Sequence, residues 1–100
     1  MNDFQKNFDL FVKGCQKISD DYMERVSPTL PKPTLTVSEG KRYMKLVRDS
    51  SVHCFVDKTT GAVLKAAGWN SPAKHARGNI FDSSNGLSTM GHYGPAYLRG

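Results

Sequence analysis

The stretch DKTTGAVLKAAGWNSPAKHARGNIFD, residues 57–82, carries the clearest structural signals in this sequence of 100 residues. Asp57 can accept hydrogen bonds from the amides that follow it, and Gly61 can adopt a positive φ, so DKTTG predicts a tight hairpin turn. The segment Ala62–Ala66 then predicts a strand that returns antiparallel to the strand before the turn. Beyond Gly68 the stretch predicts a loop in which basic side chains lie between two aromatic residues. These side chains are Trp69, Lys74, His75, Arg77 and Phe81.

Three short segments before this hairpin also have the composition of strands, because they are rich in β-branched or alternating apolar residues. The alternation is clearest where Val52, Cys54 and Val56 share one face. Turns are predicted at Glu39-Gly40 and at residues 49–51, which makes the segments an antiparallel meander. The predicted strands are Thr34–Ser38, Arg42–Arg48, Val52–Val56 and Ala62–Ala66.

Residues 3–26 predict one long amphipathic helix, because their apolar side chains recur at alternating spacings of four and three. The stripe consists of Phe4, Phe8, Phe11, Cys15, Ile18, Tyr22 and Val26. Ser27-Pro28 ends the helix, since the residue before a proline avoids the helical conformation. Gly14 lies off the stripe and is either tolerated there or marks the close approach of another segment.

The seven-residue repeat of this stripe allows two interpretations. The face packs on the protein's own sheet, or part of it also pairs with the helix of a second copy and forms a homo-oligomer. The Phe and Tyr side chains favour packing on the sheet, because tight two-stranded coiled coils prefer Ile, Val and Leu at these positions. Both interpretations stay open at the level of sequence.

One helix followed by a meander of strands predicts an α+β architecture. We expect a single domain over residues 1–100, with the N-terminal helix packed on an antiparallel sheet of three or four strands and an irregular C-terminal third. Its parts are the helix at 1–26, a proline-rich connector at 27–33, the strands at 34–67 and a loop-rich tail at 68–100. A small Sm-like barrel, which also begins with a helix, is the architectural alternative.

The composition of the chain indicates whether it crosses a membrane, carries a signal peptide or forms a disulfide. No apolar run approaches the roughly 20 residues that cross a bilayer, so no membrane partner is expected. Charged residues such as Asp3 and Lys6 interrupt what would be the apolar core of a signal peptide, which predicts a cytoplasmic location. Cys15 and Cys54 lie in apolar segments and are expected to be buried thiols rather than a disulfide.

Positive charge is concentrated in the middle of the chain. The formal net charge is +5, and residues 41–77 hold eight Lys and Arg against two Asp, whereas residues 1–26 are almost neutral. A basic middle favours an acidic partner, either nucleic acid or an acidic protein. The alternative is that the charge serves only solubility.

The sequence carries no recognisable catalytic or metal-binding motif. The histidines His53, His75 and His92 do not occur at metal-ligand spacings, and His53 and Cys54 point to opposite faces of a regular strand. Neither a nucleophile elbow nor a phosphate-cradling glycine motif is present. We therefore expect no enzyme activity, no cofactor and no metal.

The strongest candidate for a binding site in the sequence combines basic and aromatic side chains. If the strand at 62–66 stays regular through Trp69, then Trp69 projects to the same face as Lys65, with Lys45 from another strand beside them. Aromatic faces stack bases and cations hold phosphates, which together make a sequence-tolerant site for single strands. The alternative is that Trp69 is a core residue and that the cations are solvated. The candidate nucleic-acid-binding residues are Lys45, Lys65, Trp69, Lys74, His75 and Arg77.

The stretch at 55–82 resembles a segment of small proteins of marine tailed phages, especially phages that infect cyanobacteria. The matching residues are Phe55, Asp57, Gly61, Val63, Lys65, Ala67, Trp69, Pro72, Lys74, Arg77, Gly78, Asn79 and Ile80. Tyr43–Val47 before it and Tyr93–Tyr97 after it are also similar, so the resemblance covers about residues 43–97. It implies a phage-encoded protein in the host cytoplasm and supplies no activity. Gly68 stands where the family has Ser, which puts the turn at that point in doubt.

Two functions follow as expectations. The first is a non-enzymatic phage accessory protein that binds nucleic acid through its basic and aromatic residues. The second is a structural or protein-interaction module that forms a homo-oligomer, through the N-terminal helix or a sheet edge, and that contacts an acidic protein through its basic loop.

Overall fold

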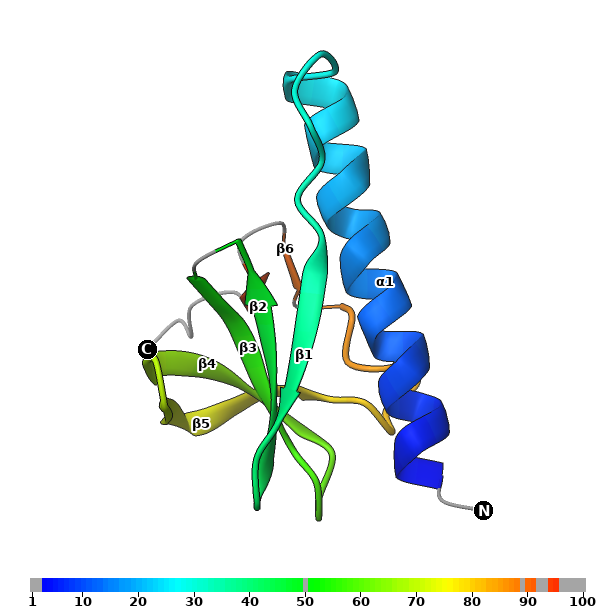
Figure 1. Ribbon diagram of the computed structural model, residues 1–100. Coiled ribbons are helices and arrows are strands. Elements are labelled where there is room, and N and C mark those ends of the chain that lie inside the picture. The colour runs from blue at the N-terminus through cyan, green and yellow to red at the C-terminus, as the bar shows by residue number, and fades with distance from the viewer. Residues whose placement is uncertain (1–2, 50, 89, 92–93, 96–100) are drawn as a thin grey trace.

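The chain folds as one long helix packed on a five-stranded antiparallel sheet, which confirms the predicted α+β architecture (Figure 1). The computed structural model describes residues 3–49, 51–88, 90–91 and 94–95, so His92, Tyr93 and the end of the predicted tail lie outside the described residues. The main elements are α1 (Asp3–Val26), β1 (Leu35–Glu39), β2 (Tyr43–Arg48), β3 (Ser51–Asp57), β4 (Ala62–Gly68) and β5 (Ser71–Asn79). Two short strands, β6 (Met90–Gly91) and β7 (Gly94–Pro95), form a separate pair.

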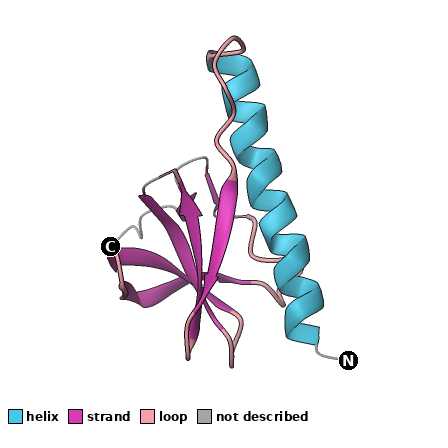
Figure 2. Ribbon diagram, in the orientation of Figure 1, coloured by secondary structure: helices cyan, strands magenta, loops and turns pink. Residues whose placement is uncertain are grey.

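The five strands of the main sheet follow one another in chain order, and every neighbouring pair is antiparallel (Figure 2). β1 and β5 are therefore the two edges of the sheet. Within the described residues these edges do not pair with each other, so the sheet stays open and the Sm-like barrel is not formed.

β5 corrects the prediction that the chain from Gly68 onward is a loop. Its sequence, SPAKHARGN, is poor in the β-branched and aromatic residues that favour strands. Its pairing with β4 is interrupted by several register shifts, which accommodate Pro72 on an edge strand. β5 forms because its main chain pairs with β4. The residues of β5 themselves give little indication of a strand, which is why the sequence did not predict it.

The helix has the predicted bounds, but its buried face differs from the predicted stripe at its C-terminal end. Ser19 is buried where the heptad pattern predicted Ile18, and Val26 is 49% exposed. A straight α-helix has 3.6 residues per turn, so its buried face drifts away from a seven-residue repeat. Figure 1 shows the C-terminal end of α1 extending past the sheet, with residues 27–34 running back beside it.

The core lies between α1 and one face of the sheet. Phenylalanines from the first three turns of the helix pack on apolar residues of the strands and on Ile80, which follows β5. The fully enclosed members of this cluster include Phe11, Leu46, Cys54, Val56, Val63 and Ile80, each with an exposed fraction of 0%. Cys15 and Cys54 are both free and buried, which confirms the prediction for the cysteines. Burial raises the pKa of the Cys15 thiol to about 12, so this thiol stays protonated.

The hairpin between β3 and β4 has the predicted turn. Asp57 Oδ1 accepts hydrogen bonds from the amides of Thr59 and Thr60 at 2.7 and 3.1 Å. Gly61 has a φ of +78°, a conformation that favours glycine, and its amide donates to the Asp57 carbonyl at 2.8 Å. A carboxylate and a glycine therefore close this turn, as the local sequence indicated.

Gly14 marks a close approach, since a Cβ atom at this position would overlap Cδ1 of Leu87. An alanine normally stabilises a helix interior by about 1 kcal/mol relative to glycine. We expect Gly14→Ala to lose this gain, because the Leu87 side chain must move. Thermal unfolding of Gly14→Ala, Leu87→Ala and the double variant measures how strongly positions 14 and 87 interact. If Gly14→Ala alone stabilises the protein by the full amount, the contact with Leu87 is not tight.

Within the described part of the chain, no helix combines the length and the apolar run that crossing a bilayer requires.

Candidate nucleic-acid interface

The face of the sheet that points away from α1 carries the basic and aromatic residues. Cross-strand partners share a face, and Phe55 of β3 pairs with Lys45 of β2 on one side and with Leu64 of β4 on the other. Leu64 in turn pairs with Ala76 of β5. Phe55 and Leu64 are buried, and they form an apolar floor beneath the charged side chains.

Lys45 and Trp69 lie together, as predicted. The Lys45 ammonium is 4.4 Å from the centre of the Trp69 ring and donates a hydrogen bond to Asn70 Oδ1 at 3.0 Å. Both partners are uncharged, so neither offsets the positive charge of the lysine. The Trp69 side chain is not a core residue, because its exposed fraction is 52%. An exposed aromatic ring with a cation beside it is suited to stacking a base and holding a phosphate.

A second cation–aromatic pair lies close by on β2 and the turn before it. The guanidinium carbon of Arg42 is 5.2 Å from the Tyr43 ring centre, and Tyr43 packs edge-on against Phe55 with ring centres 5.9 Å apart. Arg42 Nε also lies 3.3 Å from Asp57 Oδ2. Arg42 is 71% exposed despite this ion pair, which leaves most of the guanidinium open to solvent.

The Asp57 carboxylate is stabilised in its charged form. Burial alone would raise its pKa, but hydrogen bonds from the amides of Thr59 and Thr60 and from Arg42 outweigh burial and hold the pKa below the ordinary value. Asp57 therefore stays ionised at neutral pH. Its oxygens are already engaged by the turn and by Arg42, which makes Asp57 a structural anion of this surface.

Two adjoining hollows, of about 200 and 430 Å³, lie on this face and share Arg42 and Tyr43. Lys45 lines the smaller hollow with Asn70, and Lys74 lines the larger one. We call the group around these hollows the basic–aromatic surface. It comprises Lys41, Arg42, Tyr43, Lys45, Trp69 and Lys74.

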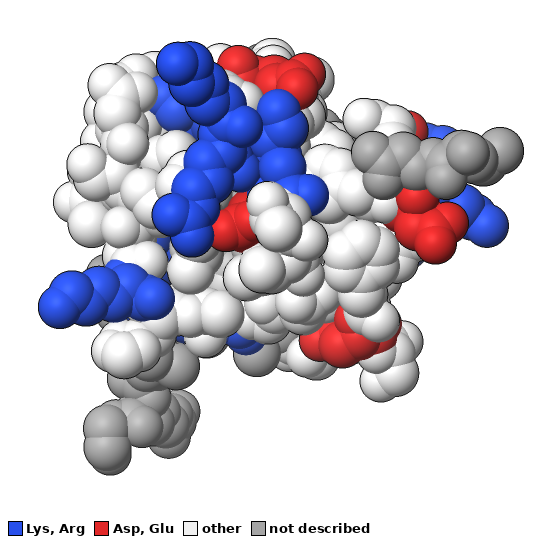
Figure 3. Space-filling model, turned by 90° about the horizontal axis from the view of Figure 1, so that it is seen from below, with Lys and Arg blue, Asp and Glu red and all other residues white. Residues whose placement is uncertain are grey.

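Charge on this surface is predominantly positive. Figure 3 looks onto the hairpin ends of the sheet and shows Lys and Arg side chains gathered in one patch, with carboxylates beside it. Lys58, in the turn after β3, forms an ion pair with Glu39 at 2.6 Å. Lys41 and Lys74, in contrast, have no carboxylate partner among the residues that the structure describes. The surface therefore retains cations that can bind anionic groups from solution.

Three of the six predicted site residues lie apart from this surface. Lys65 alternates with Leu64 along β4, so it falls on the opposite face, which carries Val63. His75 is exposed in the irregularly paired part of β5 and lines neither hollow. Arg77 is half-buried, and its Nε and Nη1 atoms are enclosed. Trp69 does not follow the face of Lys65, because it lies in the turn after β4.

The residues that sequence reasoning missed are Lys41, Arg42 and Tyr43. A signal for one of them was present, because Tyr43 and Lys45 alternate with the core residue Met44 and so share a face. The positions of Lys41 and Arg42 depend on the turn between β1 and β2, which places them beside the hollow that Lys45 lines.

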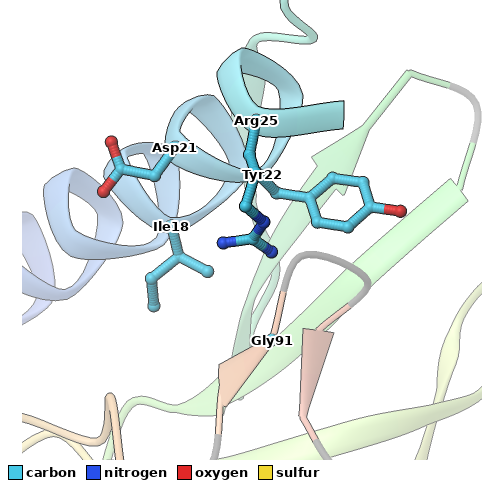
Figure 4. A pocket seen from close by; sticks show the side chains of 5 residues that line it. All are labelled: Ile18, Asp21, Tyr22, Arg25 and Gly91. Atoms are coloured by element: carbon cyan, nitrogen blue, oxygen red, sulfur yellow. The ribbon is translucent and has the colours of Figure 1, made fainter. Parts of the chain in front are cut away.

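Another hollow, of about 310 Å³, lies between the C-terminal half of α1 and β6 (Figure 4). The Arg25 guanidinium points from the helix toward the strand that carries Gly91, and it lies 5.7 Å from the Tyr22 ring centre. Asp21 points away from Arg25 and pairs with Lys17 at 2.9 Å. This hollow offers one cation and one aromatic ring, a smaller set of binding groups than the basic–aromatic surface.

Comparison with known proteins places the chain in a family. A family model matches residues 4–96, which include all of α1 except Asp3, the main sheet and the whole basic–aromatic surface. The chain belongs to this family of unknown function, DUF7717. Searches of curated proteins and of solved structures gave no match. Membership of DUF7717 assigns no activity, so function has to be argued from the surface itself.

Proposed function

We propose that this protein is a non-enzymatic accessory protein that binds single-stranded nucleic acid through the basic–aromatic surface. Following the resemblance to phage proteins, we place its action in the cytoplasm of an infected host cell. The partner in this proposal is single-stranded DNA or RNA, bound with little sequence preference.

The pairing of Lys45 with the exposed ring of Trp69 carries the proposal. Proteins that bind single strands combine aromatic rings, on which bases stack, with cations that follow the phosphates. Here Trp69 supplies a ring, and Lys41 and Lys74 supply cations around the two adjoining hollows. The two hollows share Arg42 and Tyr43, so one extended strand can pass from one to the other.

The chemistry of the surface favours binding over catalysis. Asp57, the carboxylate that lines the larger hollow, is engaged by turn amides and by Arg42. Its lowered pKa makes it a poor proton carrier at neutral pH. Across the described residues, no group of three or more His, Cys, Asp or Glu side chains is arranged to hold a metal ion.

Fluorescence anisotropy with a labelled oligothymidylate tests the proposal directly. We expect binding at low salt that weakens as salt rises, with log K falling against log salt at a slope of about −3 if four phosphates are contacted. An oligomer of glutamate at the same charge density serves as competitor. If glutamate competes as well as the oligonucleotide, the surface recognises acidic protein instead, and no binding at low salt overturns the proposal.

Substitutions assign the binding to named residues. We expect Lys41→Ala, Lys45→Ala and Lys74→Ala together to reduce the magnitude of the salt slope by about 2, because each phosphate contact contributes roughly 0.7 on a single strand. The matched control changes Lys6, Lys17 and Lys32 to alanine, which removes the same charge from other parts of the protein. Equal losses in both triple variants would mean that only net charge matters.

Trp69→Ala tests stacking separately from charge. We expect it to weaken binding by about 1–3 kcal/mol while the salt slope changes little, because stacking releases no counterions. Trp69→Phe should recover part of the loss, since it restores an aromatic face. Unchanged affinity in Trp69→Ala would remove this residue from the site.

A further inference from the structure

The outer edge of β1 is available for pairing with another strand. The Gly40 amide donates to the Tyr43 carbonyl at 2.9 Å, so residues 40, 38 and 36 direct their main-chain groups toward β2. The alternate residues Leu35, Val37 and Glu39 direct theirs away from the sheet. All positions of β1 after Leu35 are exposed.

One end of this edge is already occupied by α1. The Gln16 side chain accepts a hydrogen bond from the Leu35 amide at 2.9 Å and donates one to the Pro33 carbonyl at 2.9 Å. This contact confirms that the Leu35 amide points outward. The outward main-chain groups of Val37 and Glu39 have no such side-chain partner among the described residues. The available edge is therefore the segment from Val37 to Glu39.

A groove of about 410 Å³ accompanies this available edge. It lies between α1 and β1, and its lining is mainly apolar, with one lysine and one aspartate at its margin. Val37, with an exposed fraction of 45%, forms part of its wall. The other lining residues are Gln5, Phe8, Asp9, Val12, Lys13 and Met44.

We propose that a second copy of this chain docks here, with its own β1 antiparallel to the first around a two-fold axis at Ser38. In this register Val37 of each copy lies opposite Glu39 of the other, and Ser38 lies opposite itself. The unpaired amides and carbonyls of both residues then form four hydrogen bonds, two from each copy. The Leu35 amide, which already donates to Gln16, takes no part in these four hydrogen bonds.

Charge also favours a second copy in this register. Side chains of Val37 and Glu39 project to the face that carries α1, because their partners Leu46 and Met44 belong to the core. Glu39 of the second copy therefore lies beside the groove wall that includes Lys13. The two-fold axis creates this Lys13–Glu39 contact twice. Glu39 is 64% exposed in its present pair with Lys58, so it can exchange partners.

The other edge of the sheet is less suited to strand addition. β5 contains Pro72, several register shifts and exposed charged residues, which are the features that protect natural edges from pairing. β1 has neither a proline nor a register shift within Leu35–Glu39, and Glu39 is its one charged residue. The difference directs self-association to β1 and away from β5.

The two-fold pairing also brings the two basic–aromatic surfaces together. Ser38 lies at the axis, and it lines the smaller hollow of that surface with Lys45. A dimer therefore joins the hollows of both copies on the face away from the helices. This consequence concerns the proposed function, whereas the pairing itself does not depend on nucleic acid.

Sedimentation velocity of the full chain without nucleic acid tests the pairing. We expect a monomer–dimer equilibrium in which the dimer is populated at roughly 100 µM protein. Pairing through one short strand forms a small interface, and small interfaces bind weakly. Val37→Pro should abolish the dimer, because it removes an outward amide and no bond to β2. Circular dichroism checks that this variant keeps its secondary structure.

Charge reversal gives a test that keeps the fold intact. Lys13→Glu and Glu39→Lys should each raise the dimer Kd about tenfold, and the double variant should recover most of the loss. Lys17→Glu, one helical turn further along and outside the groove, should leave the Kd unchanged. The proposal is overturned if the wild-type protein stays monomeric at all concentrations. It is also overturned if the dimer Kd of the double variant is no lower than that of the single variants. Either result leaves the oligonucleotide titration unaffected.

Discussion

Replacing Phe11 by alanine is expected to lower the free energy of unfolding by about 3–5 kcal/mol, the largest effect of any single substitution considered for this protein. The Phe11 side chain is completely buried in the cluster between α1 and the sheet. Its removal loses the burial of an aromatic ring and leaves a cavity among side chains of both layers. Small domains have only about 5–15 kcal/mol of stability in total, so the variant should be close to unfolding.

Urea denaturation followed by circular dichroism measures this loss. Leu10→Ala is the matched control, because Leu10 is the preceding residue of the same helix and is 50% exposed. We expect it to change stability by less than about 0.5 kcal/mol. Equal losses at the two positions would mean that α1 does not pack on the sheet through the face described above.

Replacing Asp57 by alanine is expected to cost about 2 kcal/mol, since two turn amides lose their acceptor and Arg42 loses its anion. Asp57→Asn should cost less, because its side-chain oxygen can still accept from Thr59 and Thr60. Asp21→Ala, which removes a carboxylate from an exposed pair on α1, should cost less than about 0.5 kcal/mol.

The same carboxylate makes a contribution that depends on pH. The pKa of Asp57 is lower in the folded protein than its ordinary value of 3.8. Its stabilisation is therefore complete above that ordinary value and is lost as the pH falls through the lower folded value. Stability curves from pH 7 to pH 2 should fall less steeply in acid for Asp57→Ala than for the wild type. Parallel curves would show that the folded pKa of Asp57 is not lowered.

Some acid sensitivity should remain in the Asp57 variants, because Asp82 also has a lowered pKa. The amide of Gly86 and the hydroxyl of Ser84 donate to the Asp82 carboxylate, which favours its charged form. Double substitution of Asp57 and Asp82 should therefore flatten the acid limb of the curve further than either single change.

The sequence predicted one contact of the site correctly but not the direction of the side chains that follow β4. The prediction that Lys45 lies near Trp69 is confirmed, as is the arrangement of strands that brings them together. The prediction depended on Trp69 continuing the face of Lys65, however, and the chain turns before Trp69 instead. Irregular pairing between β4 and β5 decides which way the later side chains point. A shift of one residue in a strand moves a side chain to the other face.

Sequence alone determined the features that arise between residues close in the chain. The helix over Asp3–Val26, the carboxylate-closed turn after Asp57 and the order of the first four strands all follow from local periodicity and turn chemistry. Tertiary structure alone decided that residues 71–79 form an edge strand and that Ser19 replaces Ile18 in the core. It also decided which cations meet, because strand register depends on partners far apart in the chain.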